Sequence, residues 1–241
     1  MNRSTTMRAG VALLLCLGAA ACSDQYGEEA KIPAADQARA AEVLAAYESA
    51  RGIGNWEAAE AHAGQLQDRF PGSDAAAKLG PGLEQVRAQA EQLRESRRLG
   101  ALWDYQAVAV GQGVQRSAAI YSRTVPVGEG ELALTPDAQL VLREHPSWGR
   151  SAYLLLAQSR FECGKPCAMQ IRLDDAPAQR FAGKQADSGK GPALFIEDEA
   201  RFIEAMSRAK KVRIELPKGS GKIPALAFEV GGYDPSRFDK P

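Results

Sequence analysis

The sequence has few histidines and cysteines, the residues on which many metal sites depend, and no excess of basic residues for nucleic-acid binding. It holds two histidines, His62 and His145, and four cysteines among 241 residues. Its 30 lysines and arginines are matched by 30 acids, so the formal net charge is zero. A balanced charge gives no basic excess to attract nucleic acid, and we expect no such partner. With only two histidines, histidine-based metal binding and acid–base catalysis are limited, and we expect no cofactor and no metal.

A hydrophobic run long enough to cross a bilayer, about 20 residues, is missing as well. The start, MNRSTTMRAGVALLLCLGAAAC, instead combines Arg3 and Arg8 with a short apolar stretch over residues 11–17 and small residues after it. This arrangement is typical of a secretory signal peptide. We expect residues 1–21 to be removed, which leaves 28 basic against 30 acidic side chains and a net charge of −2.

The residues before Cys22 are three alanines, Ala19 to Ala21. The segment resembles the lipobox of bacterial lipoproteins and departs from it at Ala19, where leucine is commoner. The resemblance implies that Cys22 carries diacylglycerol and palmitate chains and that Ser23 directs the protein to the outer membrane. The alternative is an ordinary cleavage site with Cys22 left as a free thiol. Because several acyl chains anchor a protein stably, we expect a lipidated N-terminus and tether over residues 22–35, on the periplasmic face.

Residues 36–100 have the composition and spacing of helices. Ala, Glu, Gln, Leu and Arg predominate, and all are good helix formers. Apolar side chains recur at helical spacing in three stretches, so we expect a helical hairpin or a three-helix region. Asp36 and Asn55 are placed to cap the first and second helices, and Ser73 or Asp74 the third.

Part of this region resembles one tetratricopeptide-type repeat. Gly54, Trp56, Ala59 and Pro71 have the relative spacing of that repeat's turn glycine, aromatic, alanine and closing proline. The resemblance covers about 34 residues, the length of one repeat, and departs from the family at Ala50, where an aromatic residue is usual. It implies a groove that binds a segment of a partner protein, whereas a plain helical hairpin is the alternative.

Residues 101–241 change to a period of two. One segment, 199–209, keeps helical spacing, and Asp198 is placed to cap it. We therefore predict an α+β protein, with the helical region followed by an antiparallel β-sandwich-like domain that contains one helix. The spacing of the turn residues is that of an antiparallel sandwich or barrel. The expected strands are residues 105–110, 115–122, 139–143, 152–158, 168–173, 179–183, 212–216 and 225–230.

The order of segments in this second part resembles known periplasmic domains. A strand over residues 170–175, the segment 194–198, a helix and a last strand over 227–233 follow one another. This order is similar to that of type VI secretion accessory lipoproteins and invasion-associated locus B-like proteins. The resemblance implies a periplasmic domain and brings no catalytic residues with it.

Cys163 and Cys167 flank a turn-forming Gly-Lys-Pro. In an oxidising periplasm a disulfide between them is the leading interpretation. A redox-active pair is the alternative, although the thioredoxin motif has two intervening residues and a helix after it. Zinc would need more ligands than the neighbouring sequence offers.

Three other motifs have simpler explanations than chemistry. Adjacent Asp174 and Asp175 before Ala-Pro indicate a turn more than a calcium or acid–base site. A Ser147, His145 and Asp137 set lacks the surrounding motif of a serine hydrolase. The segment 219–222 lacks the first glycine and the last hydroxyl of a phosphate loop.

A short basic cluster crosses the end of the predicted late helix, at Arg208, Lys210, Lys211 and Arg213. Cations favour helix C-termini, and an anionic partner such as lipopolysaccharide is a further reading. Taken together, these features predict a non-enzymatic, lipid-anchored binding or adaptor protein that has an envelope protein partner and supports envelope assembly or secretion. The alternative is an envelope or cell-wall hydrolase with an unrecognised active site. The oligomeric state does not follow from these patterns.

Overall fold

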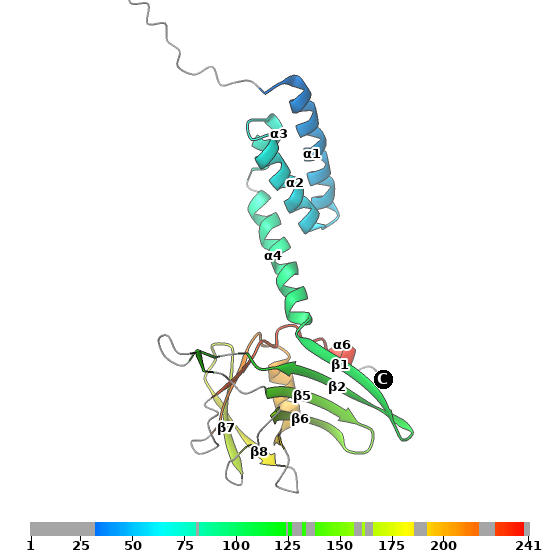
Figure 1. Ribbon diagram of the computed structural model, residues 1–241, viewed down its shortest axis with the longest axis vertical. Helices are drawn as coiled ribbons and strands as arrows, with labels where there is room; N and C mark the ends of the chain where they lie inside the picture. Colours follow the sequence, from blue (N-terminus) through cyan, green and yellow to red (C-terminus); the bar gives the residue numbers. More distant parts are fainter. Residues whose placement is uncertain are drawn as a thin grey trace, which may run out of the picture.

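A computed structural model shows a helical arm joined to a curled sheet, which confirms the expected α+β class (Figure 1). The residues 1–21 of the expected signal, Cys22 and Cys163 lie outside the residues that it describes. Within the described parts of the chain, none of the helices combines the length and apolar composition that a bilayer-spanning segment needs. The structure describes residues 32–80, 82–123, 125–126, 132–133, 138–156, 161, 166–185, 192–216 and 225–238.

The arm consists of four helices with a small core of their own. They are α1 (Ala34–Gly52), α2 (Trp56–Arg69), the short α3 (Asp74–Ala77) and α4 (Gly82–Gly100). Small residues on α1 and α2 let the helices approach closely. The buried residues of this core are Ala40, Leu44, Tyr47, Ala50, Ala59, Ala63, Leu66, Ala75, Leu79, Leu83 and Val86.

Side-chain capping follows the expectation at the second and third helices, whereas Asp198 precedes the helix Glu199–Met206 without a capping hydrogen bond from its side chain. The Asn55 side chain accepts a hydrogen bond from the Ala58 N–H at the start of α2, and the Ser73 hydroxyl accepts one from the Ala76 N–H at α3. The expectation for Asp36 is wrong. Helix α1 begins at Ala34, and Asp36 lies in its first turn, where a carboxylate favours the positive end of the helix dipole.

Nine strands form one antiparallel sheet in the order β1-β2-β5-β6-β9-β8-β7-β10-β11. A separate pair, β3 (Val125–Pro126) and β4 (Leu132–Ala133), lies between β2 and β5 in the chain. The strands of the large sheet are β1 (Trp103–Val110), β2 (Gly113–Tyr121), β5 (Ala138–His145), β6 (Gly149–Leu156), β7 (Cys167–Leu173), β8 (Gln179–Gln185), β9 (Ala193–Ile196), β10 (Val212–Glu215) and β11 (Leu226–Phe228).

Of the sandwich and barrel arrangements that the strand spacing allowed, the structure is nearer the barrel: the strands of the large sheet do not divide into two packed sheets. Hydrogen bonding runs without interruption from β1 to β11, and the sheet curls around helix α5 (Glu199–Met206) (Figure 1). Phe202, Ile203 and Met206 of α5 fill the concave face together with the inward residues of the strands. The short α6 (Pro235–Phe238) adds Phe238 to the same core, so the described part of this region holds two helices where one was expected.

The curl almost closes the sheet on itself. Arg123, just beyond β2, forms a β-bridge with Ala227 of β11. The last strand therefore meets the continuation of the second strand, and β1 is left outside this closure.

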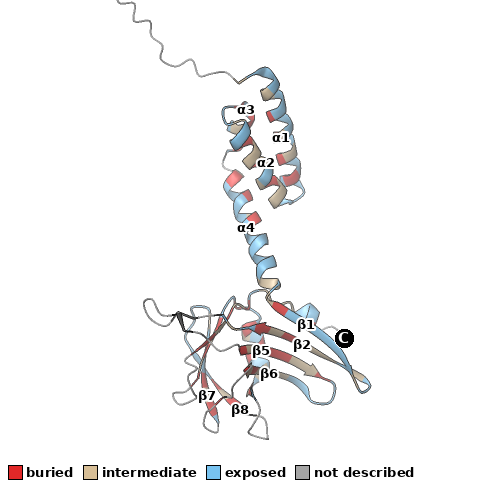
Figure 2. Cartoon of the chain, viewed as in Figure 1, coloured by how far each residue is buried: buried red, intermediate tan, exposed pale blue. Residues whose placement is uncertain are grey.

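The arm meets the sheet at one point, the C-terminal end of α4. The last turns of α4 are exposed between the two bodies (Figure 2). At their end, the Trp103 Nε1–H donates to the Val230 carbonyl at 3.3 Å, and Arg98 forms an ion pair with Glu229 at 3.0 Å. Gly232 lies directly against the backbone of Leu99.

Candidate functional site

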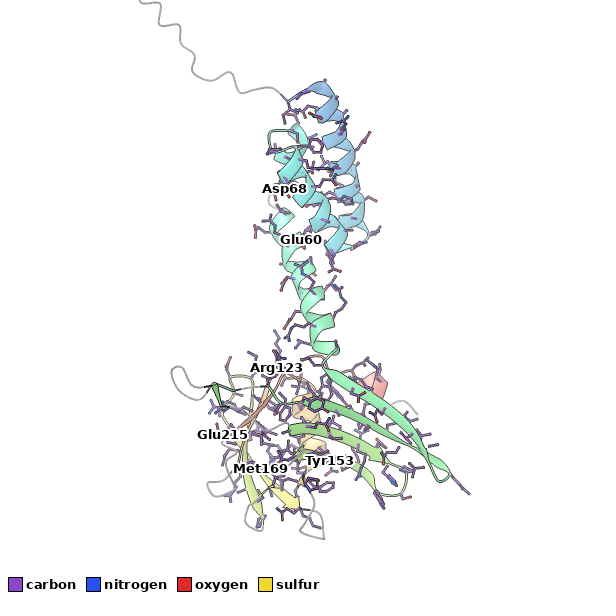
Figure 3. All side chains as sticks on the ribbon, viewed as in Figure 1. Glu60, Asp68, Arg123, Tyr153, Met169 and Glu215 are labelled. Carbon is purple, nitrogen blue, oxygen red and sulfur yellow. The ribbon has the colours of Figure 1, made fainter. Side chains whose placement is uncertain are left out.

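Three arginines and an alanine lie in one row across the outer face of the sheet. Arg172 of β7 is the register partner of Arg213 of β10, which is in turn the partner of Ala227 of β11, and Ala227 bridges Arg123. Their strand neighbours Ile171, Ile214 and Phe228 point into the core, and alternation along a strand therefore directs this row outward. Figure 3 shows Arg123 near the foot of the arm.

The short side chain of Ala227 leaves a hollow between the longer ones. We call this hollow the basic groove; its volume is about 210 Å³. Four of its residues carry a positive charge and two a negative charge. The lining residues are Arg123, Arg172, Asp174, Lys211, Val212, Arg213, Ala227, Phe228 and Glu229.

Two of the cations are neutralised by nearby carboxylates. Glu229 accepts from Arg98 of α4 and from Arg123, each at 3.0 Å, and the hydrogen bond from Arg98 lowers the pKa of the Glu229 carboxyl. Arg213 pairs with Glu215 at 2.9 Å. These ion pairs fix the guanidinium groups of Arg123 and Arg213 beside the groove and that of Arg98 at the foot of the arm.

The other two cations of the groove form no ion pair, although Lys211 contributes, after Arg98, to the lowered pKa of the Glu95 carboxyl on α4. The side chains of Arg172 and Lys211 are exposed and form no hydrogen bond or ion pair with any other described residue. Moreover, Arg172 stands directly opposite Arg213 on the neighbouring strand. Like charges at directly opposed positions destabilise a sheet, but the Glu215 carboxylate offsets the charge of Arg213 here. Arg172 is therefore the arginine of the groove that lacks a carboxylate partner among the described residues.

The predicted turn at Asp174 and Asp175 forms the end of the groove. Asp174 adopts a left-handed conformation, with φ 49°, and its carboxylate accepts hydrogen bonds from the backbone N–H groups of Lys210 and Lys211 at 2.9 and 2.8 Å. This carboxylate fixes the start of β10 against the end of β7. Its oxygens are thereby engaged by backbone, and the turn interpretation is confirmed.

The residues of the hydrolase alternative meet only in part. Ser147 follows His145 in the β5–β6 turn, where the Ser147 backbone N–H donates to His145 Nδ1 at 3.1 Å. His145 is 6% exposed and stacks on Trp148, with ring centroids 3.9 Å apart. Asp137 lies outside the described residues. Nδ1 is thus occupied by a backbone donor, and the contact does not involve the serine hydroxyl.

Cys167 begins β7, is buried and takes part in a disulfide. Cys163 lies outside the described residues, so the pairing of these two cysteines stays a prediction. His62 lies half-buried on α2. The described part of the chain contains no cluster of three or more histidine, cysteine or acidic side chains placed to hold a metal ion. The segment 219–222 is outside the described residues.

Of the basic residues that are close together in the sequence between Arg208 and Arg213, only some lie together in the structure. Lys211 and Arg213 line the groove, whereas Arg208 points elsewhere and pairs with Glu204 at 2.8 Å. Arg123, just beyond β2, and Arg172 of β7 were not found by sequence reasoning, because they are distant in the chain from each other and from Lys211 and Arg213. The available signal was the outward position of Arg172 in its predicted strand.

Comparison with known proteins adds little to what the structure itself shows. No family model matches the chain, and no curated protein matches it. Among solved structures, the chain is similar to invasion associated protein B from Bartonella henselae, with 12% identity and a TM-score of 0.33. That match covers 54% of this chain and 85% of the other. Of the resemblances suggested by the sequence, the one to invasion-associated proteins thus has a weak structural counterpart, and the tetratricopeptide and lipoprotein resemblances have no family-model match.

Proposed function

We propose that the protein is a non-enzymatic binding or adaptor protein, held through Cys22 at the periplasmic face of the outer membrane, that takes an acidic segment of an envelope protein into the basic groove. The observation that carries this proposal is that Arg172, which stands opposite the ion-paired Arg213, forms no ion pair with any other described residue. A carboxylate beside Arg172 gains charge-assisted hydrogen bonds there without displacing Glu215 from Arg213. The partner would be a component of envelope assembly or secretion.

The shape and lining of the groove support binding over catalysis. Its volume of about 210 Å³ is below the 300–1,000 Å³ common for small-molecule pockets and suits one or two side chains of a protein segment. None of its described lining residues is a serine, cysteine or histidine. Its described residues offer charge and an apolar floor at Ala227, and among them there is no nucleophile with a neighbouring base.

The arm supports a role away from the anchoring membrane. The N-terminal end of α1 lies at the far end of the arm from the sheet (Figure 1). Helix α4 alone, with 19 residues at 1.5 Å each, is about 28 Å long. Anchoring through Cys22 would thus let the sheet and its groove reach a partner within the periplasm.

A photo-crosslinking experiment in living cells tests the proposal. A crosslinking amino acid replaces Gln170, which is exposed on β7 two residues from Arg172 on the same face. We expect one discrete protein adduct that disappears when Arg172→Glu is added. Arg39→Glu, an equal charge change on α1 that removes only a surface pair with Asp36, should leave the adduct intact. The absence of a discrete adduct, or its persistence with Arg172→Glu, would contradict the proposal.

A further inference from the structure

The two end strands of the large sheet differ in whether their outer side is paired. At β11, the outer side of Ala227 is occupied by the bridge to Arg123, and the sheet closes there. At β1, no described strand lies on the outer side, so this strand forms an open edge of the sheet. A row of backbone N–H and C=O groups at such an edge is a template for pairing with another strand.

The inner face of β1 is covered at its start, at Tyr105, and is exposed further along. The Tyr105 hydroxyl accepts the Asp234 backbone N–H, and the Tyr105 ring lies under the Arg237 guanidinium at 4.2 Å. From Gln106 to Ala109, by contrast, every residue is exposed, with Val108 at 52%. In Figure 1 this part of the β1–β2 hairpin projects beyond α6.

The open part carries none of the features that usually protect an edge. Natural edge strands are blunted by lysine, proline, a bulge or an inward charge. The sequence Gln-Ala-Val-Ala-Val over residues 106–110 has no charge and no proline. All eight residues of β1 pair in unbroken register with β2, from Trp103 opposite Ile120 to Val110 opposite Gly113, so there is no bulge.

We propose that β1 pairs antiparallel with β1 of a second copy of this chain, around a two-fold axis at Ala107, and joins the two sheets into one. In this register Tyr105 stands opposite Ala109 of the partner copy, so that a bulky side chain meets a small one on the inner face. On the outer face Gln106 stands opposite the partner's Val108. A two-fold contact of this kind uses the same surface of both copies, which is the commonest form of assembly.

Charge and symmetry favour a second copy as the occupant. Asp104, the charged residue of β1, stands opposite the partner's Val110, so no like charges meet across the pair. The same strand supplies both halves, and its apolar, β-branched and small residues are suited to a cross-strand interface. The pairing also leaves the basic groove free, because the groove lies at the other end of the sheet, on β7, β10 and β11.

Cysteine substitution of the purified full-length chain tests the register. In the two-fold register the Cα atoms of position 107 in the two copies lie about 4.5–5.5 Å apart, within disulfide range. Mild oxidation should therefore give a disulfide-linked dimer with Ala107→Cys. Ala109→Cys places the two thiols roughly 13 Å apart along the strands and should give none. Equal crosslinking of both variants, or none with Ala107→Cys, would overturn the proposal.

Charge substitution provides an independent test by sedimentation. The full-length chain in detergent should sediment at twice the monomer mass, and Ala107→Lys and Ala107→Glu should each sediment as monomers. An equimolar mixture of these two variants should return to the dimer mass, because opposite charges then face each other. The control Val114→Lys, on β2 and 41% exposed, should stay dimeric. A monomeric wild-type chain, or a mixture that stays monomeric, would refute the pairing. Either result is also what we expect if the edge binds a strand of another protein.

Discussion

Substitution of Gly232 by alanine should loosen the junction between the arm and the sheet. A Cβ atom at this position would lie 2.2 Å from the Leu99 carbonyl carbon and 2.3 Å from the Gly100 nitrogen. Both are backbone atoms at the end of α4 and cannot rotate away. Ordinary contacts of a Cβ atom begin near 3.4 Å. The two backbones must therefore separate by about 1 Å.

The size of the effect follows from the contacts at this junction. Overpacking of this kind typically costs about 1–3 kcal/mol. Separation also strains the hydrogen bond from Trp103 to Val230, which contributes about 1 kcal/mol. The Arg98–Glu229 pair adds little, because Arg98 is largely exposed to solvent. We expect a loss of about 2–4 kcal/mol, which in a chain of this length lowers the melting temperature by roughly 4–16 °C.

Thermal unfolding of the full chain, followed by circular dichroism, measures this loss. Two neighbouring glycines give a graded control. A Cβ at Gly231 would meet the Lys210 Cα at 3.2 Å, so Gly231→Ala should have a smaller effect. Gly100 has open space around it and lies in α4, so Gly100→Ala should be neutral or slightly stabilising. The reasoning is refuted if Gly232→Ala melts within about 1 °C of the wild-type chain, or if Gly100→Ala is the most destabilised of the three.

The remaining predictions concern the anchor, the disulfide and the groove. Cys22→Ser should move the protein from the membrane fraction to the soluble fraction, whereas retention without attached lipid would contradict anchoring. Thiol labelling of denatured, unreduced protein should leave Cys163 and Cys167 unmodified, and ready labelling would indicate free thiols. Arg172→Thr should leave stability unchanged or raise it by up to about 1 kcal/mol in chemical denaturation, because Arg172 has no ion pair to lose and Glu215 offsets part of the charge of the opposed Arg213; a loss of stability would contradict the absence of a partner for Arg172. The pKa of Glu229 is lowered in the folded protein by an arginine of α4, so its stabilising effect is present above the unfolded pKa of about 4.5 and is lost as the pH falls through the folded pKa. Melting temperatures of Glu229→Gln should accordingly fall less steeply than those of the wild type below pH 4.5, and equal slopes would exclude this carboxyl as a contributor.

Local spacing in the sequence was enough to predict most elements of this protein. Apolar residues at helical spacing predicted α1, α2, α4 and α5, and a short polar side chain such as Asn55 predicted a cap, since both signals act within a few residues. Alternating residues likewise predicted eight strands of the large sheet. Strand β9 was missed because Ala193–Ile196 is short and nearly all apolar, which gives no period of two.

Only the tertiary structure decided how these elements pair. A period of two gives the inward and outward residues of a strand but not its neighbours, so the sequence did not distinguish two packed sheets from one curled sheet. The basic groove arises from the same cause. Lys211 and Arg213 were visible as a local cluster, whereas Arg172 and Arg123 join them because β7, β10, β11 and the residue after β2 meet in register. The edge at β1 is open because β1 pairs with β2 alone among the described strands and the closure through Arg123 bypasses it. That closure depends on a contact between residues about a hundred positions apart.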